Sequence, residues 1–171
     1  MLNVRSAVTS GPLIQDIITS NNLDILALTE TWLSTNDRDA ILMDLLPSDY
    51  LALHVHRPSA TTARGGGLAL VYRSNIGLSV KHHHLQDKIS HDTFELQLIS
   101  LKSDKHEIVI ANIYRPPSSS LPSFFDELSH LFTCCSGFIE KDKFVACGEF
   151  NCPGESGTVD PMLLSVFQLH G

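Results

Sequence analysis

Short apolar runs alternate with helical stripes along the chain, and this alternation predicts a layered α/β fold. Apolar residues at helical spacing predict helices over 12–21, 37–46, 121–132 and 160–169. Apolar or alternating runs bounded by turn residues predict strands over 24–29, 68–72, 94–98, 107–114 and 144–147. Pro12 would stand in the first turn of its helix, and Asn36 or Asp37 would cap the next one. Because the strands crowd the middle of the chain, we expect mixed sheets.

Length and composition are those of one globular domain. The chain has 171 residues, of which 43% are hydrophobic and 18% charged. No apolar run approaches the roughly 20 residues that a membrane span needs, and the charged opening at residues 1–5 is not followed by the apolar stretch of a signal peptide. We therefore expect an intracellular protein with no membrane partner. The four cysteines form no Cys-x-x-Cys pair, which favours reduced, idle thiols over a zinc site.

The net charge of −7 restricts the kinds of nucleic-acid contact that the chain can make. Passive binders of phosphate are usually basic, so tight binding without a cofactor is disfavoured. An enzyme that reaches a phosphate through a bound cation remains compatible with this charge, because the cation supplies the positive charge locally.

Polar residues follow three of the predicted strands, at the strand ends where layered α/β folds build their sites. These residues are Glu30, the group Asn112, Tyr114 and Arg115, and the pair Glu149 and Asn151. Two carboxylates can hold a hard divalent cation together with water, while an amide, a phenol and a guanidinium can contact a phosphate. Each side chain alone is more often an ordinary strand-end residue, so the pattern by itself leaves the function open.

Three other features have simpler interpretations. Gly65, Gly66 and Gly67, after Arg64, match no phosphate-binding fingerprint and indicate a tight entry into a strand. The run from His82 to His84 is typical of a solvated loop. Trp32 follows Glu30 closely, and we expect it to pack rather than to stack on a base.

Five strings in order resemble the endonuclease of non-LTR retrotransposons, especially of the chicken-repeat-like clade. They read LNVRS at 2–6, LTETWL at 28–33, RGGGLALVYRS at 64–74, IYRPPS at 113–118 and GEFN at 148–151. That family belongs to the exonuclease–endonuclease–phosphatase superfamily, with DNase I and abasic-site endonucleases. The resemblance covers essentially all of residues 1–171.

The resemblance implies a four-layered α/β/β/α sandwich of the DNase I type and magnesium- or manganese-dependent cleavage of DNA. Such an enzyme nicks a genomic target for retrotransposition, which implies a nuclear location and a reverse transcriptase domain on the parent polypeptide. The implied metal ligands are Glu30 and Asn3. The implied catalytic residues are Glu149, Asn151 and Tyr114, and the implied contacts to phosphate or DNA are Asn112 and Arg115.

Two departures from the family pattern bear on activity. Glu149 stands where the family has Asp, and a misplacement near 1 Å can cost about a hundredfold in rate. The family's later segment, with a catalytic histidine, has no counterpart in residues 1–171, so we expect a domain without its C-terminal strands and weak or absent nicking. The alternatives are a decayed copy that catalyses nothing, and a phosphodiesterase of the same fold that acts on a phospholipid or inositol phosphate.

Overall fold

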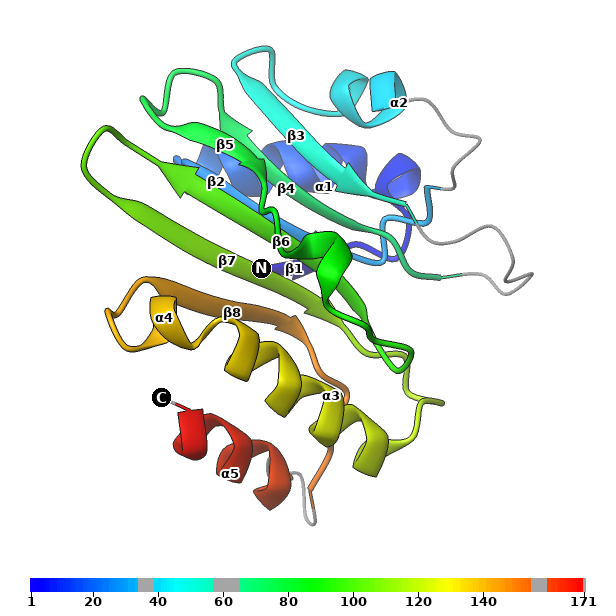
Figure 1. Ribbon diagram of the computed structural model, residues 1–171. Helices are drawn as coiled ribbons and strands as arrows, with labels where there is room; N and C mark the ends of the chain where they lie inside the picture. The colour runs from blue at the N-terminus through cyan, green and yellow to red at the C-terminus, as the bar shows by residue number, and fades with distance from the viewer. Residues whose placement is uncertain (34–38, 57–64, 155–159, 171) are drawn as a thin grey trace.

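Two mixed sheets of four strands each lie face to face between helices in the computed structural model, which describes residues 1–33, 39–56, 65–154 and 160–170 (Figure 1). The first sheet has the order β1 (Leu2–Asn3), β2 (Ile25–Thr29), β4 (Leu68–Arg73) and β3 (Tyr50–Val55). The second has the order β5 (Ser79–His82), β6 (Glu95–Lys102), β7 (Glu107–Tyr114) and β8 (Phe144–Glu149). Strands β1 and β2 run parallel, as do β7 and β8, and the other neighbours are antiparallel.

Helices cover the outer face of each sheet. Helices α1 (Ala7–Ser20) and α2 (Asp39–Asp44) pack on the first sheet, while α3 (Leu121–Cys134) and α5 (Pro161–His170) pack on the second (Figure 1). The predicted α/β/β/α layering is thus confirmed. A short helix α4 (Ser136–Ile139) follows α3, and a 3-10 turn (Gln86–Lys88) precedes β6. None of the helices in the described segments is long and apolar enough to cross a membrane.

The apolar cores explain why β6 and β7 are the clearest strands in the sequence. Their outward residues pack under Phe124 and Leu128 of α3, both fully buried. Their inward residues, such as Ile99 and Leu101, meet Ala27 and Leu70 of the first sheet. A near-continuous apolar run predicted β7, as is typical of a strand covered on both faces. Strand β6 was predicted from alternation over 94–98 as a half-buried strand, but it extends to Lys102 and both of its faces are covered.

Helix α1 begins five residues earlier than its apolar stripe predicted. Ser6 caps it by accepting a hydrogen bond from the Thr9 backbone N–H, and the Ala7 N–H donates to the Thr31 carbonyl at 2.8 Å. Pro12 therefore lies inside the helix and not in its first turn. These anchors are made with a distant strand end, so the local stripe could not reveal them.

Strands β1, β3 and β5 were not predicted, and the predicted solvated loop from His82 to His84 is confirmed only in part, since His82 and His84 are exposed but His83 is buried. His82 ends β5, and the ring of His83 is only 3% exposed, packed edge-on against Phe138 with centroids 5.3 Å apart. Burial, with a smaller effect of neighbouring His84, lowers the pKa of His83. Strand β5 contains only the first of the three histidines, and its residues are largely exposed and polar, so no apolar pattern predicted it.

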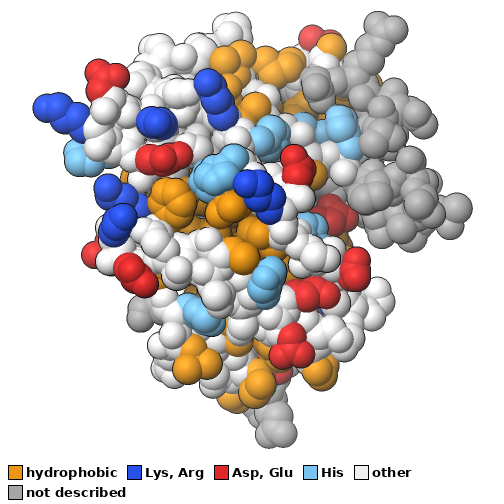
Figure 2. All heavy atoms as spheres, viewed as in Figure 1, with side chains coloured by type: hydrophobic (Ala, Val, Ile, Leu, Met, Phe, Trp, Pro, Cys, Tyr) orange, Lys and Arg blue, Asp and Glu red, His pale blue; other side chains and the backbone are white. Residues whose placement is uncertain are grey.

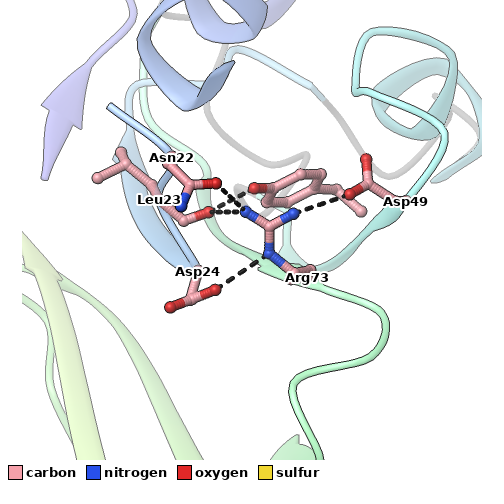
Figure 3. Close-up of polar contacts among 6 residues, drawn as sticks. Asn22, Leu23, Asp24, Asp49 and Arg73 are labelled. Carbon is pink, nitrogen blue, oxygen red and sulfur yellow. Dashed lines mark hydrogen bonds and ion pairs between the residues drawn. The ribbon is translucent and has the colours of Figure 1, made fainter. Parts of the chain in front are cut away.

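Arg73, inside one of the family-like strings, closes one end of the first sheet (Figure 3). Its guanidinium donates to the carboxylates of Asp24 and Asp49 at 3.0 and 2.9 Å and to the Asn22 side chain at 3.0 Å. It also lies over the Tyr50 ring, 4.9 Å from the centroid. Because it joins the segments that enter β2 and β3, Arg73 has a structural role far from the predicted site.

Two expectations lie partly or wholly outside the described residues: the cap at Asn36 or Asp37, and any role of Arg64. The four cysteines are free thiols, as expected, and burial raises the pKa of Cys135 to about 11.

Candidate active site

Parallel pairing brings the predicted site residues to one end of both sheets. Asn3 at the end of β1 pairs with Thr29, next to Glu30. Tyr114 at the end of β7 pairs with Glu149 at the end of β8. Since parallel strands end at the same edge of a sheet, two pairs of polar residues face one another where the sheets meet.

Tyr114 joins the two sheets at this end. Its hydroxyl donates to Glu30 Oε1 at 2.5 Å, although 84 positions separate the two residues. Glu30 itself has a backbone φ of +57°, in the left-handed region that side chains rarely adopt. The Glu30 carbonyl accepts from the Ser6 N–H at 2.9 Å, which helps to hold this conformation and directs the carboxylate towards β7.

Asn3 makes the second contact between the sheets. Its Nδ2 donates a short hydrogen bond to Glu149 Oε2, and its Oδ1 accepts from the Arg5 backbone N–H at 3.1 Å. The Asn3 amide is therefore oriented by the chain beside it and in turn orients Glu149. Its Oδ1 has two lone pairs, so one remains for a further ligand.

Gly148 lets β8 approach β7 closely enough to place Glu149. Its φ is +137°, and a Cβ atom at this position would lie 1.9 Å from the carbonyl oxygen of Ile113, its partner in the sheet. Any side chain here would push the strands apart. The first residue of the GEFN string is therefore a glycine because a side chain there would clash with β7 next to the candidate site.

Glu95 is a third carboxylate at this end, and the sequence analysis missed it. It begins β6 directly opposite Tyr114, and its Oε2 accepts from the Gly67 N–H at 2.6 Å. No motif marks it, because only the register of β6 against β7 brings it here. Glu30, Glu149 and Glu95 all raise the pKa of the Tyr114 phenol by their negative charge.

The Tyr114 phenol is strongly biased towards its neutral form. The side chain is only 6% exposed, and burial is the largest cause of its raised pKa, followed by the hydrogen bond and charge of Glu30. The neutral phenol can donate a hydrogen bond, which a phenolate cannot. Tyr114 is therefore a hydrogen-bond donor at every pH near neutrality.

The raised pKa of Tyr114 should make the free energy of unfolding depend on pH in the alkaline range. The unfolded Tyr114 ionises near the ordinary pKa of 10.0, while the folded phenol keeps its proton, so the free energy of unfolding should fall as pH rises above about 10. Tyr114→Phe should reduce that slope by up to about 1.4 kcal/mol per pH unit. Urea unfolding of both proteins between about pH 9 and 11 measures this slope. Tyr50 and Tyr72 are present in both proteins, so their contributions to the slope cancel in the difference. Equal slopes would contradict the assignment.

Arg115 and Asn151 hold one another through their backbones. Arg115 donates from Nη1 to the Asn151 carbonyl at 2.7 Å, and Asn151 Nδ2 donates to the Arg115 carbonyl at the same distance. Arg115 also donates from Nη2 to the Ser119 carbonyl and lies over the ring of Phe124. Asn151, with a φ of +47°, keeps one amide N–H and its Oδ1 for other partners.

Arg115 is therefore placed in the interior rather than on a DNA-facing surface. It is only 2% exposed, so the structure does not bring its guanidinium out to the phosphate contact that the sequence suggested. Its hydrogen bonds instead fix the loop that carries Asn151. The buried guanidinium donates to two carbonyl oxygens, those of Asn151 and Ser119, which offset part of the cost of burying its charge.

Replacing this guanidinium should loosen the Asn151 loop. Arg115→Lys keeps the charge but cannot donate to both the Asn151 and Ser119 carbonyls with a planar fork. We expect the free energy of unfolding to fall by about 1.5–3 kcal/mol, the usual value for a lost hydrogen bond to a charged group. Arg5→Lys, at an exposed position, should change it by less than about 0.5 kcal/mol. Chemical denaturation of both variants tests the difference, and equal stabilities would show that the fork is unimportant.

Asn112 is also interior. It is fully buried between the sheets, where its Nδ2 donates to the Leu28 and Ala69 carbonyls at 3.1 and 3.4 Å. The sequence suggested a contact with phosphate, but the structure leaves no surface on this side chain to make one. Asn112 instead ties β7 to β2 and β4, next to the site.

The glycine run and Trp32 flank the site. Gly65, Gly66 and Gly67 all have positive φ, and a Cβ on Gly67 would lie 2.3 Å from Thr31 Oγ1. The run is thus the tight strand entry that the sequence indicated. Trp32 is 40% exposed, so the packing role expected for it is only partial.

The donor set suits magnesium rather than zinc. Within the described residues no group of three or more His, Cys, Asp or Glu side chains is arranged to hold a metal ion. Magnesium commonly binds proteins through one or two carboxylates and keeps several waters, and Glu30 and Glu149 are two such oxygen donors. Three carboxylates around one phenol would also repel a phosphate unless a cation offset their charge.

Comparisons with known proteins identify the family and the fold of the chain. The endonuclease/exonuclease/phosphatase family matches the chain over residues 2–162. Among solved structures, the AP endonuclease LMAP from Leishmania major is similar with a TM-score of 0.71 and 13% identity, over 97% of this chain and 64% of that one. The endonuclease domain of TRAS1, a telomere-specific non-LTR retrotransposon, matches with a TM-score of 0.62 and 11% identity, over 99% and 70%.

A third similar structure is a 3′ phosphatase, NExo from Neisseria, bound to a product DNA hairpin. It has a TM-score of 0.59 and 19% identity, over 97% of this chain and 66% of that one. No curated protein sequence matches the chain. At these identities the likeness establishes the fold, and the chain spans about two thirds of the length of these structures.

Proposed function

The chain belongs to the endonuclease/exonuclease/phosphatase family, and from this premise we propose that it is a metal-dependent endonuclease that cleaves a DNA phosphodiester. A phosphodiesterase or nuclease kind of function follows from the family and its neighbours. One observation carries the proposal further. Two contacts between the sheets, Tyr114 with Glu30 and Asn3 with Glu149, place two carboxylates around one neutral phenol.

Glu30 is the residue that we assign to hold a magnesium or manganese ion, with the free lone pair of Asn3 Oδ1 beside it. One Glu30 oxygen accepts from Tyr114, and the other is left for the cation. When bound, a divalent cation polarises the phosphoryl oxygen and offsets the charge that develops on it. The nucleases of this family generally use divalent metals, which supports the assignment.

Glu149 is the residue that we assign to accept a proton from the attacking water. Asn3 orients its carboxylate, and the buried Tyr114 beside it stays protonated. A positioned general base contributes about 10²–10⁴ to a rate. Glu149 stands where the family has Asp, and in this structure its longer side chain is the one that meets Asn3.

Asn151 is the donor that we assign to the phosphate oxygens, and Tyr114 acts beside it by holding Glu30, because its single O–H donates to that carboxylate. Asn151 has one amide N–H left after its bond to Arg115, and the loop is fixed by the Arg115 guanidinium. Preorganised donors are effective because they need no reorganisation as charge develops. Asn112 and Arg115 act in this proposal by positioning the strands and the loop, and not by touching the substrate.

The five strings also support a finer proposal, that the parent is a non-LTR retrotransposon of the chicken-repeat-like kind. In that case the substrate is genomic DNA in the nucleus, and a reverse transcriptase belongs to the same polypeptide. The TRAS1 endonuclease domain shares the fold, which is compatible with this origin.

Nicking of supercoiled plasmid tests the proposed function. With the protein in excess, relaxed circles should accumulate slowly in Mg²⁺ or Mn²⁺ and not in EDTA. Two alternatives predict other outcomes. A chain that catalyses nothing leaves all substrates intact, and a phosphodiesterase of the same fold hydrolyses an inositol phosphate or phospholipid but not the plasmid. Either outcome would overturn the endonuclease assignment.

A further inference from the structure

Lysines gather at the end of the second sheet opposite to the candidate active site. All six lysines of the chain lie between residues 81 and 143, although the chain carries a net charge of −7. Four of them line one cavity of about 480 Å³, which the β6–β7 turn and the segment from α4 to β8 form. The four are Lys102, Lys105, Lys141 and Lys143.

The surface also shows basic side chains gathered at this end of the second sheet. Figure 2 shows blue side chains gathered on the left of this face, at the end where the β6–β7 turn and α4 lie in Figure 1. Red side chains are more frequent towards the lower right, beside the start of α3. This end of the molecule thus carries a cluster of basic side chains, with some acidic ones among them, despite the acidic composition of the chain.

The lysine charges in the cavity are not neutralised by ion pairs. Across the described part of the chain, the ion pairs observed are those of Arg73 with Asp24 and Asp49, and none involves a lysine. The lining contains two carboxylates, Asp104 and Glu107, and Glu107 is engaged by the Ser100 hydroxyl. Four lysines therefore outnumber two carboxylates in the lining of this hollow.

The cavity is remote from the reaction centre. Strand β7 begins at Glu107, in the lining, and ends at Tyr114, in the candidate active site. At about 3.4 Å for each residue, the two ends of this strand are roughly 24 Å apart. A ligand in the cavity therefore cannot be the reacting phosphate, although a longer polyanion can span both places.

We propose that this lysine cavity binds clustered phosphate groups of a polyanion, as a second site separate from the reaction centre. Lysine is a strongly attractive point charge for phosphate, and its flexible stem adapts to different spacings. The phosphates come either from a nucleic-acid strand or from a free oligophosphate. The site itself does not depend on the proposed nuclease activity; only its use as an anchor for the substrate rests on that function.

Two double variants of equal charge test the proposal in the full chain. Lys102→Gln with Lys141→Gln removes two charges from the cavity, while Lys81→Gln with Lys88→Gln removes two charges outside its lining. Fluorescence anisotropy with a labelled single-stranded DNA, in EDTA so that no cleavage occurs, gives the affinity at several salt concentrations. Calorimetric titration with tripolyphosphate gives the second arm, and thermal unfolding verifies that both variants are folded.

Each lysine–phosphate contact adds about 0.7 to the slope of log affinity against log salt for single strands. The cavity variant should therefore have a slope smaller by about 1.4. When salt rises from 50 to 200 mM, the factor by which its DNA affinity decreases should be about sevenfold smaller than that of the wild type. The control should keep the wild-type slope. Tripolyphosphate binding that the cavity variant alone loses, without a change in DNA binding, supports the site with a free oligophosphate as the source.

Equal slopes in the two variants, together with unchanged or absent tripolyphosphate binding, would overturn the proposal. The nicking assay is a separate measurement. Loss of magnesium-dependent nicking in a protein whose cavity still binds phosphate would contradict the proposed function and leave the lysine site intact.

Discussion

Glu30→Gln is expected to abolish metal binding at the reaction centre and to lower the nicking rate by about a thousandfold. A cation's stabilisation of the transferring phosphoryl group is worth several kcal/mol, and roughly 4 kcal/mol corresponds to that factor. Glutamine keeps an oxygen that can accept from the Tyr114 hydroxyl, so the contact between the sheets should survive. Calorimetric titration with Mn²⁺ and the plasmid assay measure the two effects.

Glu140→Gln is the matched control for this variant. It makes the same substitution and removes the same charge at an exposed position at the end of α4, outside the lining of the lysine cavity. Its metal binding and nicking should equal those of wild type. If Glu30→Gln binds Mn²⁺ as tightly as the control does, Glu30 is not the ligand, whatever the effect on nicking.

The second large effect is expected at Glu149. Glu149→Gln removes the proton acceptor but keeps an oxygen that can accept from Asn3, so the rate should fall by about 10²–10⁴ with metal binding largely retained. Glu149→Asp restores the residue type of the family, yet it should not raise the rate. In this structure Asn3 reaches the carboxylate of the longer side chain, and the shorter one would withdraw from that contact at a cost of up to about a hundredfold.

Plasmid nicking by both Glu149 variants, with Glu140→Gln as an exposed control at the end of α4, tests this expectation. Glu140→Gln should behave as wild type. A Glu149→Asp protein that is faster than wild type would show that the methylene, and not the neighbourhood of Asn3, limits the rate.

The local pattern of apolar residues was sufficient to predict the helices and strands whose buried residues repeat at regular intervals. The strand from Glu107 to Tyr114 and the amphipathic helix that begins at Leu121 were predicted at or near their observed bounds, because burial repeats there with the period of the element. Strands β3 and β5 were missed, since their cover is partial and their histidines are polar. The strings around Glu30, Tyr114 and Glu149 identified the strand ends at which the site is built.

What the tertiary structure alone decided is which polar side chains face the site and which face the interior. Asn112 and Arg115 stand beside Tyr114 in sequence, but the packing of one sheet on the other buries Asn112, and the Asn151 loop closes over Arg115. Glu95 enters the site only through the register of β6 against β7. The sequence by itself determined the alternation of elements and the strand-end motifs, because these depend on neighbours along the chain. The membership of the site depends on contacts across as many as 146 positions, such as that of Asn3 with Glu149, which no local period encodes.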